Sequence, residues 1–337
     1  MFFCRFYIDF LSFLYYNILI YYIQTEVLIM KIGVQSAPWF SFENPEAGFA
    51  MIKECGFDAV DFNIDHLLSP RALAKSGGPL ESFFDKSDDE IIEFFRPVKE
   101  AAERNGIEFA QMHAPFPTYI PDRDDITQYA IAATEKCLMV CAYVGCPAIV
   151  VHPYTLYAAP NKDKEHEINL SIYRALIPAA KKYKVKVCLE NLFTGFNERR
   201  YQGSCASAEE AVWYIDKLNE EAGEECFGFC FDIGHANIVA ANIRQYLNVL
   251  GKRLTILHLH DNDGHYDTHT LPYACLTGSK LTCDWDGFMA GLRDIGYEGV
   301  LNFETFRALG AFPKEVWPET LKLISAIGRM FDKKIHS

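Results

Sequence analysis

The sequence predicts an α/β fold of the (β/α)8 TIM barrel class. Eight short apolar segments recur along the 337-residue chain at intervals of about 25 to 50 residues, which leaves room for one helix after each strand. Their almost wholly apolar character is typical of parallel strands that are covered on both faces. Acidic residues and histidines follow most of the segments, as in barrels whose active site is built at the carboxyl ends of the strands.

The predicted strands follow one another along the whole of the chain after residue 30. Several of them come directly after a glycine that ends the preceding helix, as in ECGFDAV, RNGIEFA, YVGCPAIV and IGYEGVL. Glycine is favoured at that position because the left-handed conformation carries no Cβ penalty there. The eight strands are predicted at residues 31–35, 59–63, 108–112, 148–151, 185–189, 227–231, 254–259 and 300–303.

Two segments are distinguished: residues 30–337, which form the predicted barrel domain, and residues 1–29, a hydrophobic N-terminal extension. The apolar stretch 10–23 is short for a membrane span of about 20 residues, and no small-residue cleavage site follows it. Met30-Lys31-Ile32-Gly33 reads as a natural start that leads into the first strand. We interpret residues 1–29 as a spurious upstream extension, with a membrane anchor or a signal sequence as the alternatives.

The charge and the cysteine content limit which binding partners and which cellular compartment we expect. The formal net charge of -13 and the pI near 5.3 disfavour broad binding to nucleic acid or to anionic membranes. The 11 cysteines include no CxxC pair, which favours buried, reduced thiols in a cytosolic protein. We expect a cytoplasmic location, with membrane anchoring by residues 1–29 as the alternative. No nucleic-acid partner is expected, and homo-oligomerisation is left open.

Nine residues are of types that can bind divalent metals, and most of them lie at the end of a predicted strand. Most directly follow an apolar segment, as in FAQMH, AIVVH, VKVCLE, FGFCFD, LTILH and GVLNFE. A carboxylate after an apolar strand needs a partner when it is buried, and a metal ion is the simplest one. A single such acid would more simply be a salt-bridged or capping residue. The nine are His113, His152, Glu190, Asp232, His235, His258, Asp267, His269 and Glu304.

Four of these residues form a ligand set of their own. Two glutamates, one aspartate and one histidine suit Mn, Co or Zn, so we expect a divalent metal whose identity stays open. The set is Glu190, Asp232, His258 and Glu304. His166, His260 and His265 are left unassigned, because an isolated loop histidine is more often a surface residue than a ligand.

Together these motifs resemble the xylose-isomerase-like TIM barrel superfamily. That group includes sugar phosphate isomerases and epimerases, ketohexose 3-epimerases, inosose isomerases and endonuclease IV. The resemblance runs from residue 30 to about residue 331. It is carried by MHAPF, VVHP, CLEN, FDIGHAN, HLHDNDGHYDTH, CDWDGF and GYEGVLNFET.

The resemblance implies a role for each matching residue. Glu190, Asp232, His258 and Glu304 match the single-metal site of the isomerases and epimerases, in which the two glutamates also act as acid and base. His235 matches a residue that contacts substrate there. The ligands that endonuclease IV adds to make a three-metal site are matched by His113, His152, Asp267 and His269.

Two departures from the family pattern bear on the substrate. The segment His260-Asp261-Asn262-Asp263-Gly264 lacks the arginine of the ketohexose 3-epimerases, and Ala114 to Tyr119 lacks the run found in endonuclease IV. The leading hypothesis is therefore a metal-dependent isomerase or epimerase for a sugar, polyol or related carbohydrate, acting through an enediolate. A metal-dependent phosphodiesterase of the endonuclease IV type and a non-catalytic barrel are the alternatives.

In the leading hypothesis Glu190 and Glu304 are the catalytic base and acid. Substrate is expected to contact His235, His113, His152 and Trp39. Phe40 and Phe116 would add an apolar wall. For Trp39 a place in the hydrophobic core is an equal alternative.

Overall fold

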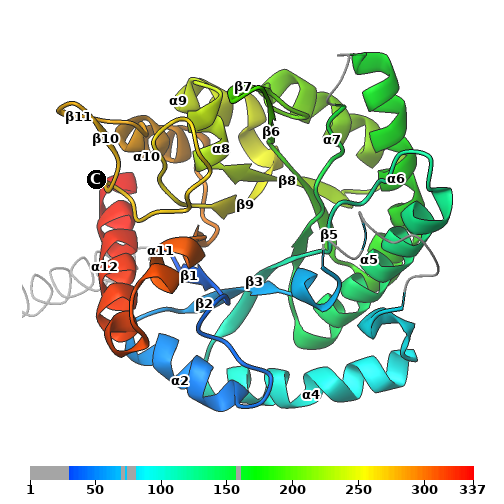
Figure 1. Ribbon diagram of the computed structural model, residues 1–337, viewed down its shortest axis with the longest axis horizontal. Coiled ribbons are helices and arrows are strands. Elements are labelled where there is room, and N and C mark those ends of the chain that lie inside the picture. The colour runs from blue at the N-terminus through cyan, green and yellow to red at the C-terminus, as the bar shows by residue number, and fades with distance from the viewer. Residues whose placement is uncertain (1–29, 70–72, 74–80, 157–160) are drawn as a thin grey trace, which may run out of the picture. The chain divides into compact units, whose positions relative to one another are not determined.

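Eight parallel strands form one sheet that closes on itself, which confirms the predicted TIM barrel. The computed structural model describes residues 30–69, 73, 81–156 and 161–337. The strand order is β12-β1-β2-β3-β4-β5-β8-β9, and a parallel bridge between Leu259 and Phe303 joins the two outermost strands. The strands lie at the centre of the molecule, and helices surround them (Figure 1).

Each of the eight predicted strands is found at its predicted place. All of them are buried along most of their length, because helices cover the outside of the barrel and side chains fill the inside. Their bounds are β1 (Ile32–Gln35), β2 (Ala59–Asn63), β3 (Glu108–His113), β4 (Ala148–Val150), β5 (Lys186–Glu190), β8 (Phe227–Asp232), β9 (Leu254–His258) and β12 (Leu301–Phe303).

Helices between the strands form the outer ring, and glycine ends several of them. Gly106, Gly145 and Gly296 adopt left-handed backbone conformations at helix C-caps, as the sequence predicts. The main helices are α2 (Pro45–Glu54), α4 (Asp88–Asn105), α5 (Asp124–Val144), α6 (Lys162–Tyr183), α7 (Ala208–Ala222), α9 (Ile243–Leu250), α10 (Trp285–Ile295) and α12 (Trp317–Ile335). Two short helices, α8 (Ile233–Ile238) and α11 (Phe306–Ala311), follow β8 and β12.

Two hairpins lie in loops that follow barrel strands, and neither was predicted. The first pairs β6 (Phe193–Phe196) with β7 (Arg199–Gln202) after β5. The second pairs β10 (Leu276–Thr277) with β11 (Lys280–Leu281) after β9. Both follow the carboxyl end of a barrel strand, which is the end that carries the site.

The barrel interior combines small apolar side chains with cysteines. One cluster of buried residues comes from four neighbouring strands and comprises Ala148, Val150, Cys188, Cys230 and Ile256. The ten cysteines within the described residues are free, and all but Cys275 are buried. Burial raises the pKa of the thiols of Cys188 and Cys230, so they pack as small apolar groups rather than as reactive thiolates.

The barrel unit spans Lys31–Ser337, and Met1–Met30 divides from it as a separate unit. The predicted hydrophobic extension, residues 1–29, lies outside the described residues. Among the helices of the described residues, none is both long enough and apolar enough to cross a bilayer.

A chain that starts at Met30 should fold as the full chain does. All eight strands and every residue of the predicted site follow Met30, so the truncation removes no part of the barrel. Circular dichroism and thermal melting of the 30–337 chain and the full chain would check this. An unfolded or insoluble truncated chain beside a folded full chain would contradict the domain boundary.

Candidate active site

The predicted site residues lie around a single cavity at the carboxyl ends of the strands. The cavity has a volume of about 530 Å³ and falls within the usual size range of small-molecule sites. Seven of the nine predicted residues line it: His113, His152, Glu190, His235, Asp267, His269 and Glu304. The other two, Asp232 and His258, are buried directly behind this lining.

The predicted four-residue ligand set converges on one nitrogen atom. Nδ1 of His258 lies 3.2 Å from Glu190 Oε1, 3.4 Å from Glu304 Oε2 and 3.8 Å from Asp232 Oδ2. His258, Glu190 and Asp232 are the last residues of β9, β5 and β8, and Glu304 directly follows β12. The carboxyl ends of four strands therefore bring these groups together. Zinc ligands about 2.0–2.2 Å from a common ion are separated by distances of this order.

The remaining predicted residues flank this set on two sides. On one side, His152 Nε2 lies 2.8 Å from Glu190 Oε2 and 3.0 Å from His113 Nε2. On the other side, Asp267 Oδ2 lies 2.9 Å from His269 Nε2 and 3.6 Å from His235 Nε2. These contacts connect the flanking groups to the central set.

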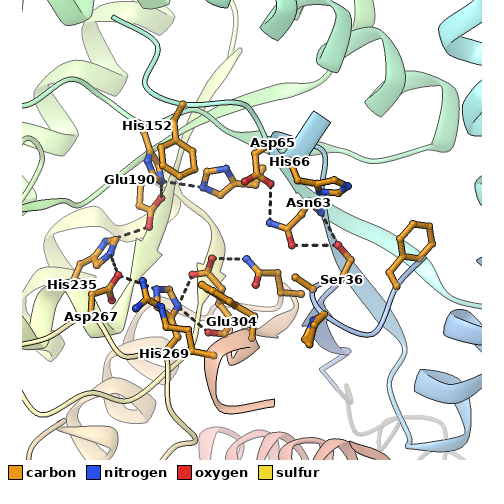
Figure 2. Close-up of a pocket in the computed structure, with 18 of the residues that line it drawn as sticks. Ser36, Asn63, Asp65, His66, His152, Glu190, His235, Asp267, His269 and Glu304 are labelled. Atoms are coloured by element: carbon orange, nitrogen blue, oxygen red, sulfur yellow. Dashed lines mark hydrogen bonds and ion pairs between the residues drawn. The ribbon is translucent and has the colours of Figure 1, made fainter. Parts of the chain in front are cut away.

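Polar residues from the first two strands form the wall opposite these groups. Figure 2 shows Ser36, Asn63, Asp65 and His66 on one side of the cavity, and Glu190, His235, Asp267 and His269 on the other. The Asn63 amide nitrogen donates to Asp65 Oδ1 at 3.1 Å, and its oxygen accepts from the Ser36 hydroxyl at 3.3 Å. Both walls can therefore hydrogen-bond to a polar ligand.

Burial and mutual charge push the pKa values of the two glutamates in opposite directions. Burial, reinforced by the negative charges of Asp232 and Glu190, raises the pKa of Glu304 to about 8 against the effect of His258. Burial also acts to raise the pKa of Glu190, but His152 and His258 outweigh it and hold this pKa well below its usual value. A pair of carboxyl groups with separated pKa values is a common basis for acid–base catalysis.

Sequence reasoning missed His260, which the structure places against the ligand set. Its ring is fully buried, and Nε2 lies 3.1 Å from both carboxylate oxygens of Asp232. A Cβ atom at Gly234 would collide with this ring, which explains the glycine in FDIGHAN. The available signal was the spacing, because residues two apart at a strand end point to the same side.

Asp61 is a second residue that sequence reasoning missed. This fully buried carboxylate on β2 lies beneath the cavity, and its Oδ2 is 3.3 Å from His258 Nε2. Gln111 and Asn302 each donate to the same oxygen at 3.2 Å. Asp61 therefore lies beside the His258 ring on the side away from the carboxylates, the place that acidic partners of metal-binding histidines occupy. The sequence signal that could have identified Asp61 was a charged residue inside an apolar strand.

Trp39 lies in the core and does not line the cavity. Its side chain is 6% exposed, its ring nitrogen donates to the Gln35 carbonyl at 2.7 Å, and it packs on Phe49. Phe40 and Phe116, the other expected apolar wall residues, do line the cavity.

The xylose isomerase-like TIM barrel family matches residues 49–327 of this chain. Inosose isomerase of Bacillus subtilis (strain 168) is 24% identical over 196 residues, which is 56% of this chain and 65% of the relative.

Solved structures of the same architecture also resemble this chain. The 3-keto-D-glucoside 4-epimerase of E. coli has a TM-score of 0.64 and 21% identity, covering 88% of this chain and 99% of that one. The IOLI protein with a bound zinc atom has a TM-score of 0.60 and 20% identity, covering 91% of this chain and 96% of that one. The match over most of the chain and the closed eight-stranded sheet lead to one conclusion: this chain belongs to the xylose isomerase-like TIM barrel family.

Proposed function

We propose that this protein is a metal-dependent isomerase or epimerase that acts on a sugar, a polyol or a related carbohydrate. The observation that carries the proposal is the pair Glu190 and Glu304, whose carboxylates lie 3.2 and 3.4 Å from the same His258 nitrogen. Similarity to an inosose isomerase and to a keto-glucoside epimerase supports the same class of reaction.

The donor set fits a divalent metal ion. Three buried carboxylates surround His258 Nδ1, and so many buried negative groups require a compensating charge. Glu190, Asp232, His258 and Glu304 would hold Mn, Co or Zn. The zinc atom in a protein of the same fold supports this assignment. Such an ion would polarise adjacent carbonyl and hydroxyl oxygens, acidify the carbon-bound proton and stabilise the negative charge that develops.

Glu190 and Glu304 move the proton. With its pKa held low, Glu190 is ionised at neutral pH and serves as the base. Glu304 serves as the partner that returns the proton: burial raises its pKa to about 8 in the metal-free protein, and a bound ion would favour its carboxylate form. Because the two residues come from strands on different sides of the barrel, one can remove the proton from one face of a carbon while the other returns a proton to the opposite face.

The surrounding residues orient the carbohydrate. The Asn191 carbonyl lies 2.9 Å from His235 Nδ1 and Asp267 lies 3.6 Å from Nε2, which orients the His235 ring at the cavity wall, where it can contact substrate. His113 and His152 offer further hydrogen bonds. Within the described residues, Arg307 is the one arginine or lysine in the cavity lining, so a substrate without a phosphate group is favoured.

A second candidate function, a phosphodiesterase of the endonuclease IV type, rests on the flanking residues. His113, His152, Asp267 and His269 line the same cavity and are ligand types that could hold further ions near the first. Three metals would then activate water and bind phosphate. The number of ions that each chain retains distinguishes the two functions.

We predict that dialysed protein retains close to one divalent ion per chain. His258→Ala should lose it, because its ring nitrogen is the point on which the carboxylates converge. His152→Ala, the matched control on the flank, should keep the ion, with an affinity lowered by at most about 10- to 100-fold. Elemental analysis of each variant makes the measurement. A content near three ions that falls in His152→Ala would contradict the single-metal site and favour phosphodiester chemistry.

A further inference from the structure

A buried cysteine lies among the proposed metal ligands. Cys230 on β8 is fully buried. Its Sγ atom forms a three-donor group with Glu190 and His258, in which the donor atoms of the three side chains all lie within 4.8 Å of one another. The four residues proposed to hold the ion supply oxygen and nitrogen but no sulfur. Cys230 therefore adds a donor of a different chemical class at the same place.

The order and register of the strands explain why Cys230 lies beside both of these residues. β8 lies between β5 and β9 in the sheet. Cys230 pairs in register with Glu190 of β5. Asp232, two residues further along β8, pairs in register with His258 of β9. Side chains two residues apart on a strand point to the same face, so the Cys230 thiol points into the barrel as the Asp232 carboxylate does.

A second cysteine in the barrel interior lies at a different level from the ligands. Cys188 on β5 is fully buried and belongs to the same interior cluster as Cys230. Its register partner on β8 is Gly228, two residues before Cys230. Among the described residues, the side-chain groups that could hold an ion include Cys230 but not Cys188. Cys188 therefore shares the burial of Cys230 without its place beside the ligands.

We propose that Cys230 is a further ligand of the metal ion, and that its sulfur joins Glu190 and His258 and selects zinc over manganese. The inference rests on the metal site of the proposed function and specifies which ion that site takes. A thiolate is a soft ligand that favours zinc, whereas manganese suits sites built of oxygen donors. Without a metal the thiol stays protonated among its apolar neighbours. Coordination replaces the thiol proton with the ion, and the proton passes to solvent.

Cobalt, a spectroscopic substitute for zinc, tests for the sulfur ligand. The full chain is stripped of metal with a chelator and reloaded with an equimolar amount of Co²⁺, and its near-ultraviolet absorption is recorded. A thiolate bound to Co²⁺ gives an intense sulfur-to-metal charge-transfer band, which oxygen and nitrogen ligands do not give. We expect this band in the wild type and its loss in Cys230→Ala. Cys188→Ala, the matched control, should keep the band.

Competition between two ions measures the selectivity. Each protein is dialysed against a mixture of zinc and manganese, and the bound ions are counted by elemental analysis. Cys230→Ala should lower the ratio of bound zinc to bound manganese by at least about tenfold, because even partners outside the ligand shell change metal affinity by about 10- to 100-fold. Cys188→Ala should leave the ratio at the wild-type value.

X-ray absorption at the zinc edge uses the wild type alone, so it tests the inference even if Cys230→Ala fails to fold. We expect one sulfur about 2.3 Å from zinc, beside oxygen and nitrogen at about 2.0–2.2 Å. Bound zinc with only oxygen and nitrogen neighbours, or a cobalt band that survives in Cys230→Ala, would overturn the inference and leave the proposed function standing. A wild-type protein that binds neither zinc nor cobalt would instead count against the proposed function.

Discussion

Replacing Glu190 with glutamine should abolish proton exchange while leaving the fold intact. The Glu190 side chain is 1% exposed, and its carboxylate contacts His152, His258 and His235 at 2.8, 3.2 and 3.4 Å. Glutamine has the same size but supplies neither the base nor the negative charge. Loss of general base catalysis alone lowers a rate by about 100- to 10,000-fold, and loss of a metal ligand adds to that.

The measurement is the rate of solvent deuterium exchange into substrate, alongside metal content and circular dichroism. Glu43→Gln is the matched control, because Glu43 is exposed and lies on a different loop from the proposed catalytic groups. Its exchange rate should equal that of the wild type. An unaltered rate in Glu190→Gln would remove Glu190 from the mechanism.

Glu304→Gln should have an effect of similar size for a different reason. Glu304 accepts a hydrogen bond from Gln35 at 2.6 Å and lies 3.4 Å from His258. In the proposed mechanism Glu304 is the group that returns the proton to the substrate carbon. Glutamine can hold the same place but cannot release a proton, so exchange should again fall by about 100- to 10,000-fold. Exchange that proceeds at the wild-type rate would exclude the assigned role.

The same variant changes how the stability of the metal-free protein depends on pH. The folded protein holds the Glu304 proton up to a pKa of about 8, whereas the unfolded chain releases it near the ordinary glutamate pKa of 4.5. Stability from this group is thus fully present below about pH 4.5 and is lost as pH rises toward 8. The melting temperature of the wild type should therefore fall relative to that of Glu304→Gln across this window. Parallel curves would show that burial does not raise this pKa.

The strands of the barrel could be predicted because burial on both faces leaves a strong apolar signal. The hairpin β6–β7 has a weaker signal in the sequence. Its turn residues, Asn197 and Glu198, both have positive φ angles, as the central residues of a type I′ hairpin turn do. Asparagine is common in that conformation, but glutamate is not, so the pair does not read as a turn. The strand Phe193–Phe196 is also partly exposed and short.

Residue type and position at strand ends predicted which groups surround the cavity, but not the supporting contacts. His152 lies two residues beyond the end of β4 and still lines the cavity beside Glu190. The Asp232–His260 and Asp61–His258 pairs depend on how different strands meet inside the barrel, and one sequence does not show which strands are neighbours at a given depth. Trp39 was equally ambiguous, because the direction of a loop side chain is set by packing, here on Phe49.

In the proposed function Glu190 and Glu304 carry out metal-dependent proton transfer at a carbon of a carbohydrate. A panel of ketoses, inososes and keto-glycosides in deuterated water, followed by NMR with and without a chelator, tests it most directly. We expect deuterium at one carbon beside a carbonyl group, only in metal-loaded protein and not in Glu190→Gln or Glu304→Gln. Absence of deuterium from every sugar, together with three ions per chain and cleavage of a phosphodiester, would contradict it.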